Sequence, residues 1–172
     1  MNAALLLAPL FLIRYGLLSI LSKEAAGRAA HFAPMLKNER AAYWVYQGAT
    51  VAMVVYMFLL KIHTDQPWFY PGLIAYAIGS LLLVLAIIGF AKPMNIGFQT
   101  KGIYSVSRNP MYVAYFLYFL GCAGLTRSIL LLAVLLLFQI SAHWIILAEE
   151  RWCRQQYGEA YAQYKSKVRR YI

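Results

Sequence analysis

The sequence predicts an all-α, polytopic membrane bundle of about five transmembrane helices, followed by a short C-terminal cytoplasmic helix. Hydrophobic residues make up 62% of the 172-residue chain and charged residues 13%, whereas soluble domains carry about 45–50% apolar and about 25% charged residues. The apolar residues gather in five runs, and five helices of about 20 residues would use nearly the whole length. We therefore expect one membrane domain over residues 1–172.

The first three apolar runs cover residues 3–21, 41–60 and 70–90. The first run is interpreted as a membrane helix rather than a signal peptide, because its start carries no Lys or Arg and Arg14 interrupts its middle. Aromatic clusters at residues 43–46 and 68–70 open the next two runs, where interfacial belts of Trp and Tyr are expected. Residues 1–90 are thus predicted to form three N-terminal membrane helices.

The last two apolar runs cover residues 111–125 and 128–148, and Arg127 separates them. The fourth run extends only about 22 Å at about 1.5 Å per residue, which is short for a hydrocarbon core of about 30 Å. We therefore expect a helical hairpin that starts and ends on the same side of the membrane, whether or not it crosses fully. A polar, aromatic tail follows up to Ile172.

The distribution of Lys and Arg predicts the orientation. With the N-terminus outside, 13 of the 16 basic residues lie in the first and third connections and the C-terminal tail, while only Lys61 and Arg127 lie in the opposite loops. Short basic loops are cytoplasmic in most membrane proteins, so the C-terminus is predicted to be cytoplasmic. Basic residues in short loops between apolar runs favour contact with anionic lipid headgroups over nucleic acid.

Sequence signals for metal, disulfide and nucleotide sites are weak. Cys122 and Cys153 lie on either side of the last apolar run, residues 128–148, and are interpreted as free thiols. His31, His63 and His143 share no metal-ligand spacing with the cysteines, so no metal site is expected. The glycine-rich dinucleotide loop, the phosphate loop and the nucleophile elbow are all missing.

Candidate chemistry lies in two polar clusters on the same predicted side, at residues 102–112 and 149–158. Taken alone, the first is a helix start, with Asn109 as cap and Pro110 in the first turn. The second is a solvated exit from the membrane.

The fifth apolar run connects these clusters. Gln139, His143 and Glu150 are spaced to share one face of a helix, and polar side chains within a membrane segment usually face the bundle interior or a cavity. The polar stripe therefore ends where the Arg108 cluster begins, and helical geometry favours Glu150 as the acid that faces the pocket.

Together the clusters read G-x-Y-x-x-x-R-N-P-x-Y over residues 102–112, then a short hairpin, then Glu149-Glu150 followed by Tyr157-Gly158. This order and spacing resembles the isoprenylcysteine carboxyl methyltransferase and phospholipid methyltransferase superfamily, over about residues 96–172. The resemblance implies an integral membrane methyltransferase that uses S-adenosylmethionine on a lipid-like or prenylated amphiphile at the cytoplasmic face. Residues 91–172 would then be the cofactor-binding core.

The resemblance implies a cofactor-binding set of Ile96, Gly97, Phe98, Gln99, Tyr104, Arg108, Asn109, Pro110, Met111, Tyr112 and Glu149. A carboxylate suits the α-amino group of the cofactor, and Arg108 suits its α-carboxylate. The resemblance favours Glu149 over Glu150 as the carboxylate that binds the α-amino group. Arg108, His143 and Glu150 are the candidate catalytic residues, since an amine acceptor must lose a proton to a base; the alternative for His143 is a hydrogen-bonded packing residue.

Two departures bear on the acceptor. Asn109 stands where the prenylcysteine enzymes have His, and Ile145 stands where they have Arg, so a carboxylate acceptor lacks that partner. The R-N-P-M-Y spelling is closer to phospholipid N-methyltransferases, and the tyrosine-rich tail is closer to carboxyl methyltransferases. Two other classes stay open: an NADPH-dependent reductase of isoprenoids or sterols, although its usual Trp-Arg-Tyr run is missing, and a non-enzymatic membrane scaffold. The oligomeric state is not predicted.

Overall fold

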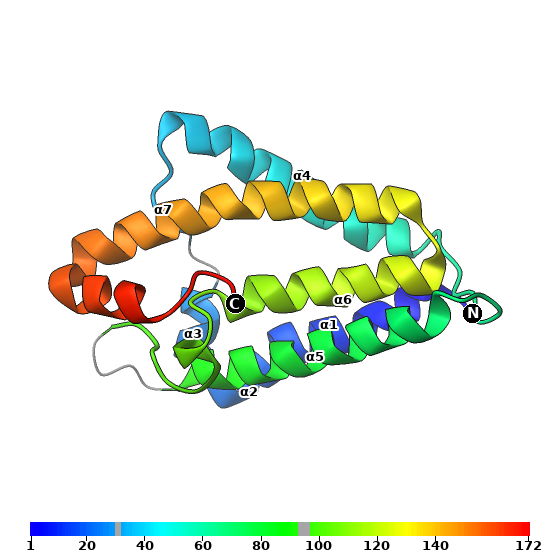
Figure 1. The fold of residues 1–172 in the computed structure, drawn as a ribbon, viewed down its shortest axis with the longest axis horizontal. Coiled ribbons are helices and arrows are strands. Elements are labelled where there is room, and N and C mark those ends of the chain that lie inside the picture. Colours follow the sequence, from blue (N-terminus) through cyan, green and yellow to red (C-terminus); the bar gives the residue numbers. More distant parts are fainter. Residues whose placement is uncertain (30–31, 93–96) are drawn as a thin grey trace.

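The computed structural model describes residues 1–29, 32–92 and 97–172, and all regular secondary structure in that part of the chain is helical, as predicted (Figure 1). The elements in chain order are η1 (Ala3–Leu6), α1 (Leu7–Phe11), η2 (Leu12–Leu17), α2 (Leu18–Leu21), α3 (Lys23–Arg28), α4 (Lys37–Met57), α5 (Phe69–Ala91), η3 (Gly102–Ser105), α6 (Pro110–Thr126) and α7 (Ile129–Lys167).

The first four elements form one continuous helical run, Ala3–Leu21, which we call the first membrane helix. Its start is capped by Asn2, whose Oδ1 accepts a hydrogen bond from Ala4 N at 2.7 Å. Its middle, η2, is a π-helical turn that contains Arg14. The predicted helix over residues 3–21 is thus confirmed, whereas the short helix α3 that follows was not predicted.

The helix α4 begins at Lys37, four residues before the predicted apolar run. The early start has a local cause, because Glu39 Oε2 accepts a hydrogen bond from Leu36 N at 2.8 Å and so satisfies a free donor at the helix end. The helices α5 and α6 begin and end within one residue of the predicted runs.

The last helix, α7, continues well beyond the predicted end at residue 148. Only Gly158 interrupts it, with φ 51° and ψ −125°, and the chain then folds back as a short helix (Figure 1). The residues after the membrane exit, such as Glu149, Arg151 and Gln155, are good helix formers, so the helix ends only where a glycine permits the turn. The predicted short C-terminal helix is the part beyond Gly158.

Within the part of the chain that the structure describes, three helical stretches are long and apolar enough to cross a membrane, Ala3–Leu21, Phe69–Ala91 and Ile129–Lys167. The helix α4 has the length but is less apolar, and α6 is apolar but has only 17 residues. The chain is therefore an integral membrane protein by length and composition of its helices. That α4 and α6 also cross, for five spans in all, stays a prediction.

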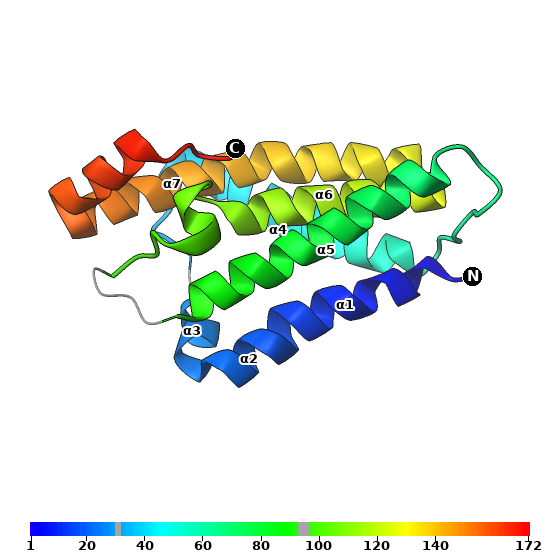
Figure 2. The ribbon, with the colours of Figure 1, turned by 60° about the horizontal axis from the view of Figure 1, so that its bottom comes forward.

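The helices α5 and α6 lie between the first membrane helix and α7 (Figure 2). They approach each other through glycines: a Cβ on Gly79 would lie 2.4 Å from Tyr118 N, and one on Gly121 would lie 2.3 Å from Tyr76 N. Small residues of this kind allow the backbones of membrane helices to pack closely. A tight turn through Arg127, with φ 51°, then joins α6 to α7.

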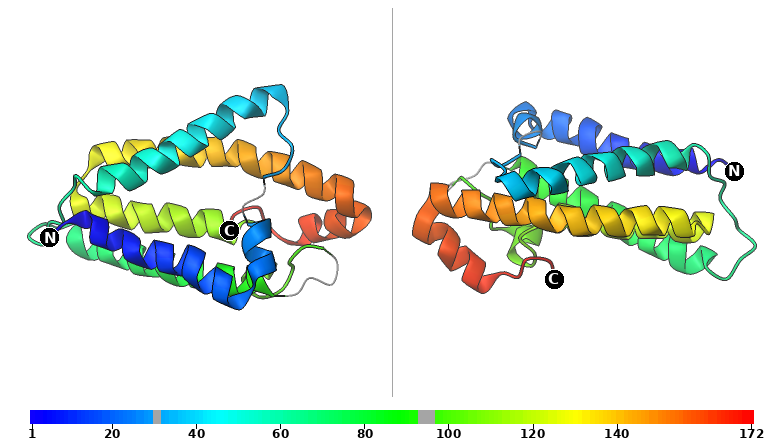
Figure 3. Two further views of the ribbon diagram at one scale, coloured as in Figure 1. Left: turned by 180° about the vertical axis from the view of Figure 1, so that it is seen from behind. Right: turned by 90° about the horizontal axis from the view of Figure 1, so that it is seen from above.

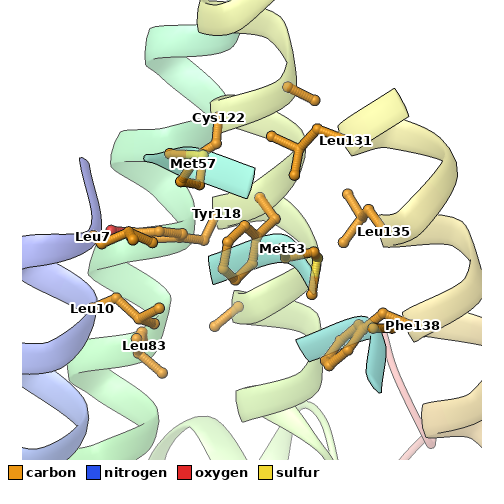
Figure 4. Close-up of a cluster of buried hydrophobic side chains, with 14 of the residues drawn as sticks. Leu7, Leu10, Met53, Met57, Leu83, Tyr118, Cys122, Leu131, Leu135 and Phe138 are labelled. Carbon is orange, nitrogen blue, oxygen red and sulfur yellow. The ribbon is translucent and has the colours of Figure 1, made fainter. Parts of the chain in front are cut away.

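The buried apolar core fills one half of the bundle, near the α6–α7 turn and the N-terminus (Figure 4). Backbone hydrogen bonds close this end, from Ala3 N to Leu60 O at 3.0 Å and from Ile62 N to Met1 O at 2.9 Å. The side chains labelled in Figure 4 are Leu7, Leu10, Met53, Met57, Leu83, Tyr118, Cys122, Leu131, Leu135 and Phe138. The other half of the bundle holds the polar clusters.

Candidate active site

A cavity of about 1320 Å³ adjoins this core, and the core residues Leu10, Met53 and Phe138 form part of its wall. Its walls come from the first membrane helix, α3, α4, α6 and α7, together with residues 97–109. Figure 3 shows α4 lying along α7, the pair that forms one side of it. Small-molecule sites usually measure about 300–1,000 Å³, so this cavity has room for more than one small ligand.

Both polar clusters predicted from the sequence line this one cavity. Ile96 lies outside the described residues. The other predicted cofactor-binding residues are all in the lining, namely Gly97, Phe98, Gln99, Tyr104, Arg108, Asn109, Pro110, Met111, Tyr112 and Glu149. The fold therefore brings residues 97–112 and the acidic pair on α7 to a common space, although about 40 residues separate them.

Both acids of the pair line the cavity, and Glu149 lies there among aromatic side chains. The Tyr112 hydroxyl donates a hydrogen bond to Glu149 Oε1 at 3.3 Å. The ring of Tyr46 stacks on Phe138 with centroids 4.9 Å apart and meets Tyr112 edge-on at 6.3 Å. A carboxylate in such surroundings is shielded from water, and aromatic faces attract cations, so this corner of the cavity suits a positively charged ligand group.

Glu150 is turned away from this corner and binds three cations. Its Oε1 lies 2.7 Å from Arg108 Nη2, and its Oε2 lies 2.9 Å from Arg170 Nη2 and 3.4 Å from Lys165 Nζ. Neighbouring residues on a helix point about 100° apart, so the side chains of Glu149 and Glu150 have different contacts. A catalytic role for Glu150 stays a prediction, and its three ion pairs favour a structural role instead.

Arg108 is engaged in the same network. Its Nη1 donates to Lys165 O at 2.9 Å and to Val168 O at 3.1 Å, and Nη2 bonds Glu150. Only its Nε is buried without a hydrogen-bond partner among the described residues. Most N–H groups of Arg108 are therefore already engaged by the chain, and its contact with a cofactor carboxylate stays a prediction.

Residues 168–172, which we call the C-terminal strap, lie across the start of α6. Arg108 N donates to Arg169 O at 3.0 Å, and Asn109 Nδ2 donates to Arg170 O at 3.1 Å. Asn109 precedes α6 as predicted, but its side chain bonds the strap rather than the free N–H groups of the helix. The strap thus fixes the two motif residues from outside the cavity.

His143 faces the strap and is not part of the cavity lining. Its Nδ1 lies 2.7 Å from the Tyr171 hydroxyl. Gln139, one turn earlier, is also outside the lining. Gln139 and His143 therefore lie on a different side of α7 from Phe138 and Glu149, which line the cavity. A role for His143 as a base stays a prediction, and its position does not support that role.

A second aromatic cluster holds the segment that precedes the motif. The ring of Phe98 lies 5.2 Å from Tyr157, 5.3 Å from Tyr161 and 5.5 Å from Tyr164, centroid to centroid. Gly97 has φ 83°, and a Cβ there would lie 2.3 Å from Tyr157 Cε1. Only glycine fits at this position, so the C-terminal helix determines where residues 97–99 enter the cavity wall.

The cavity also includes side chains that the sequence did not single out. Tyr46 and Tyr115 contribute to the wall, as does Arg14 from the first membrane helix. Arg14 had a signal in the sequence, since it is the one charged residue in the apolar run 3–21. Tyr46 was interpreted from the sequence only as part of the interfacial aromatic cluster 43–46, and Tyr115 had no signal, because a tyrosine in a helix of this composition is equally compatible with packing.

An ion pair joins α7 to the start of α4. Arg151 Nη2 donates to Glu39 Oε2 at 2.7 Å and to Pro34 O at 3.1 Å. The hydrogen bond from Arg151 holds the pKa of Glu39 below its ordinary value. This contact places the loop before α4, including Phe32 and Pro34, over the side of the cavity.

A family model described as phospholipid methyltransferase matches residues 72–160. The chain belongs to the phospholipid methyltransferase family. The matched segment contains η3, α6, nearly all of α5 and α7 as far as the turn at Gly158, and thus both polar clusters. No curated protein and no solved structure matches the chain.

Membership in this family indicates a membrane methyltransferase, and it suggests that the substrates are lipids. The N-terminal part of the cavity wall, with Arg14 and Tyr46, lies outside the matched residues. Among the described residues, no group of three or more His, Cys, Asp or Glu side chains is arranged to hold a metal ion.

Proposed function

We propose that the chain transfers a methyl group from S-adenosylmethionine to a lipid-like amphiphile that enters from the cytoplasmic leaflet. One observation carries the proposal: Glu149 and Tyr112, from the two family-matched clusters, meet in the wall of a single cavity of about 1320 Å³. A site for two substrates needs such a shared space, because methyl transfer requires donor and acceptor in line.

The residues present fit S-adenosylmethionine. The cofactor supplies a methyl group already activated by a sulfonium. The Glu149 carboxylate suits its ammonium group, and the rings of Tyr46 and Tyr112 suit its positive charge. The chain's contribution is to hold both substrates, orient them and exclude water, since methyl transfer needs little else from the protein.

The apolar part of the cavity suits the chains of the acceptor. Leu10, Phe11 and Leu18 line it from the first membrane helix, and Met53 and Val54 line it from α4. These side chains extend the space from the polar corner toward the membrane interior. An amphiphile can therefore place its headgroup near Glu149 while its hydrocarbon stays in apolar surroundings.

Positive charge supports a cytoplasmic site. Arg108 and Arg170 of the strap pair with Glu150, the neighbour of Glu149 on α7, and most Lys and Arg residues belong to the connections and tail expected on this side. The positive-inside rule assigns that side to the cytoplasm, with the N-terminus outside.

Ligand stabilisation of the purified, detergent-solubilised chain tests the proposal. S-adenosylmethionine and its demethylated product S-adenosylhomocysteine should raise the unfolding temperature, because a ligand at 100 times its Kd stabilises by about 2.7 kcal/mol. Glu149→Gln should abolish the shift, and Arg154→Gln, an exposed change on the same helix, should not. Stabilisation by NADPH alone would favour the reductase, and no response to any of these ligands would contradict an enzymatic site of this kind.

A further inference from the structure

Arg14 is a charged side chain within the first membrane helix, and it lines the cavity. It lies in the π-helical turn η2, and π-helical turns occur frequently at functional sites. A guanidinium within a membrane span is costly, so such residues face the bundle interior and have a partner there.

Among the described residues, the hydrogen-bond partners of Arg14 leave one nitrogen of its guanidinium unsatisfied. Nη2 donates to Ala29 O at 2.9 Å. Nη1 is buried and has no hydrogen-bond partner among residues 1–29, 32–92 and 97–172. The other arginines of the cavity wall have carboxylates, since Arg108 bonds Glu150 and Arg28 lies 3.8 Å from Glu24.

Arg14 and Glu149 act on a common part of the cavity. Burial raises the pKa of the Tyr104 hydroxyl far above its ordinary value; the Arg14 guanidinium opposes this rise in pKa and the Glu149 carboxylate adds to it. Both charged side chains line the same cavity, Arg14 from the first membrane helix and Glu149 from α7. Within the described residues no ion pair joins them, since Arg14 donates to Ala29 O and Glu149 accepts from Tyr112.

We infer that Arg14 forms an anion-binding subsite for the methyl acceptor, which therefore carries a phosphodiester or a carboxylate next to its apolar chains. The inference rests on the proposed function and names the substrate class. Leu10, Phe11 and Leu18 lie beside Arg14 in the cavity wall and would contact the apolar chains. An uncharged isoprenoid or sterol would leave the buried donor unsatisfied, which selects against it.

Lipid binding to the full chain tests the subsite. The variants are Arg14→Gln, Arg14→Lys and, as the matched control, the exposed Arg154→Gln. Dioleoyl phosphatidylethanolamine, oleic acid and dioleoylglycerol are titrated separately onto protein in detergent micelles, and bound lipid is counted by native mass spectrometry. S-adenosylhomocysteine is titrated in parallel.

Arg14→Gln should weaken binding of the anionic-group lipid by about 10- to 100-fold, as expected for loss of a charge-assisted hydrogen bond. Binding of dioleoylglycerol and S-adenosylhomocysteine should stay unchanged. A loss confined to phosphatidylethanolamine identifies a phosphodiester, and a loss confined to oleic acid identifies a carboxylate. Arg14→Lys keeps the charge but loses the planar guanidinium, so it should bind the anionic-group lipid more weakly than wild type and more tightly than Arg14→Gln. If Arg14→Gln does not fold, the comparison of Arg14→Lys with wild type provides the test.

Equal affinities of wild type and both Arg14 variants for the two anionic-group lipids would overturn the inference. A loss confined to S-adenosylhomocysteine would also overturn it, because Arg14 would then bind the cofactor. If wild type fails to bind S-adenosylhomocysteine, the proposed function fails, but the lipid titrations still decide whether Arg14 binds an anion.

Discussion

The Arg108 guanidinium and the Glu150 carboxylate lie 2.7 Å apart, and their side chains are only 7% and 5% exposed. Arg170 and Lys165 reach the same carboxylate from the strap and the C-terminal helix. One buried acid thus joins the start of α6, the long helix α7 and the end of the chain. The cavity wall between them depends on this junction.

Glu150→Gln is expected to destabilise the protein by about 3–5 kcal/mol, because it leaves the buried charge of Arg108 uncompensated. The free energy of unfolding in detergent with added denaturant measures the effect. Glu24→Gln is the matched control, since the Glu24 side chain is 89% exposed in its pair with Arg28 and such pairs contribute about 0–1 kcal/mol. Equal losses for the two variants would show that the junction is not structural.

Removal of the C-terminal strap is expected to abolish cofactor binding while the membrane helices stay folded. A chain ending after Lys167 loses the carbonyls that hold Arg108 and Asn109 and one cation of Glu150. A chain ending after Tyr171 loses only the exposed Ile172 and should bind as wild type does. Calorimetric titration with S-adenosylhomocysteine compares them, and equal binding by both truncated chains would contradict a role for the strap.

Gly121→Ala is expected to destabilise the α5–α6 contact by about 1–3 kcal/mol, since the new methyl group meets backbone rather than a movable side chain. Gly48→Ala in α4 meets nothing within 4 Å and should stabilise by about 0.5–1 kcal/mol, the usual gain within a helix. Thermal unfolding of both variants tests the contact. Similar shifts for the two would mean that α5 and α6 are less closely packed.

The Glu39–Arg151 pair predicts a dependence of stability on pH. The pKa of Glu39 is lower in the folded protein than its ordinary value, because Arg151 donates hydrogen bonds to the carboxylate. Its contribution is therefore complete above the unfolded pKa of about 4.3 and is lost as the pH falls toward the lower folded value. Wild type should lose more stability than Glu39→Gln below that pH. Parallel stability curves for the two proteins in acid would contradict the pairing.

The helix positions could be predicted from the sequence because runs of apolar residues and their glycine, proline and charged boundaries are local signals. The runs ending near Leu21 and Ala91 gave helices at the expected places. The end of α7 was missed because apolarity marks where a helix leaves the membrane, not where it stops. Gly158, already visible in the sequence, was the better signal for its end.

The candidate site was predictable only in part, because the choice between adjacent residues depends on packing. Helix spacing to His143 favoured Glu150, whereas in the structure Glu149 lies beside Tyr112 at the cavity and Glu150 binds Arg108. The strap contacts of Asn109 join residues about 60 positions apart and have no signature in spacing. Arg14 could have been predicted as a site residue, because a lone charge within an apolar run usually faces the bundle interior or a cavity.

Methyl transfer itself tests the central claim most directly. The purified chain in phosphatidylethanolamine vesicles, or in vesicles that contain oleic acid, is incubated with methyl-labelled S-adenosylmethionine, and label in extracted lipid is counted. Wild type should label one of these lipids, and Glu149→Gln should lower kcat/KM by about 10- to 100-fold through loss of a charge-assisted contact. Absence of labelled lipid with wild type, or equal transfer by Glu149→Gln, would contradict the account.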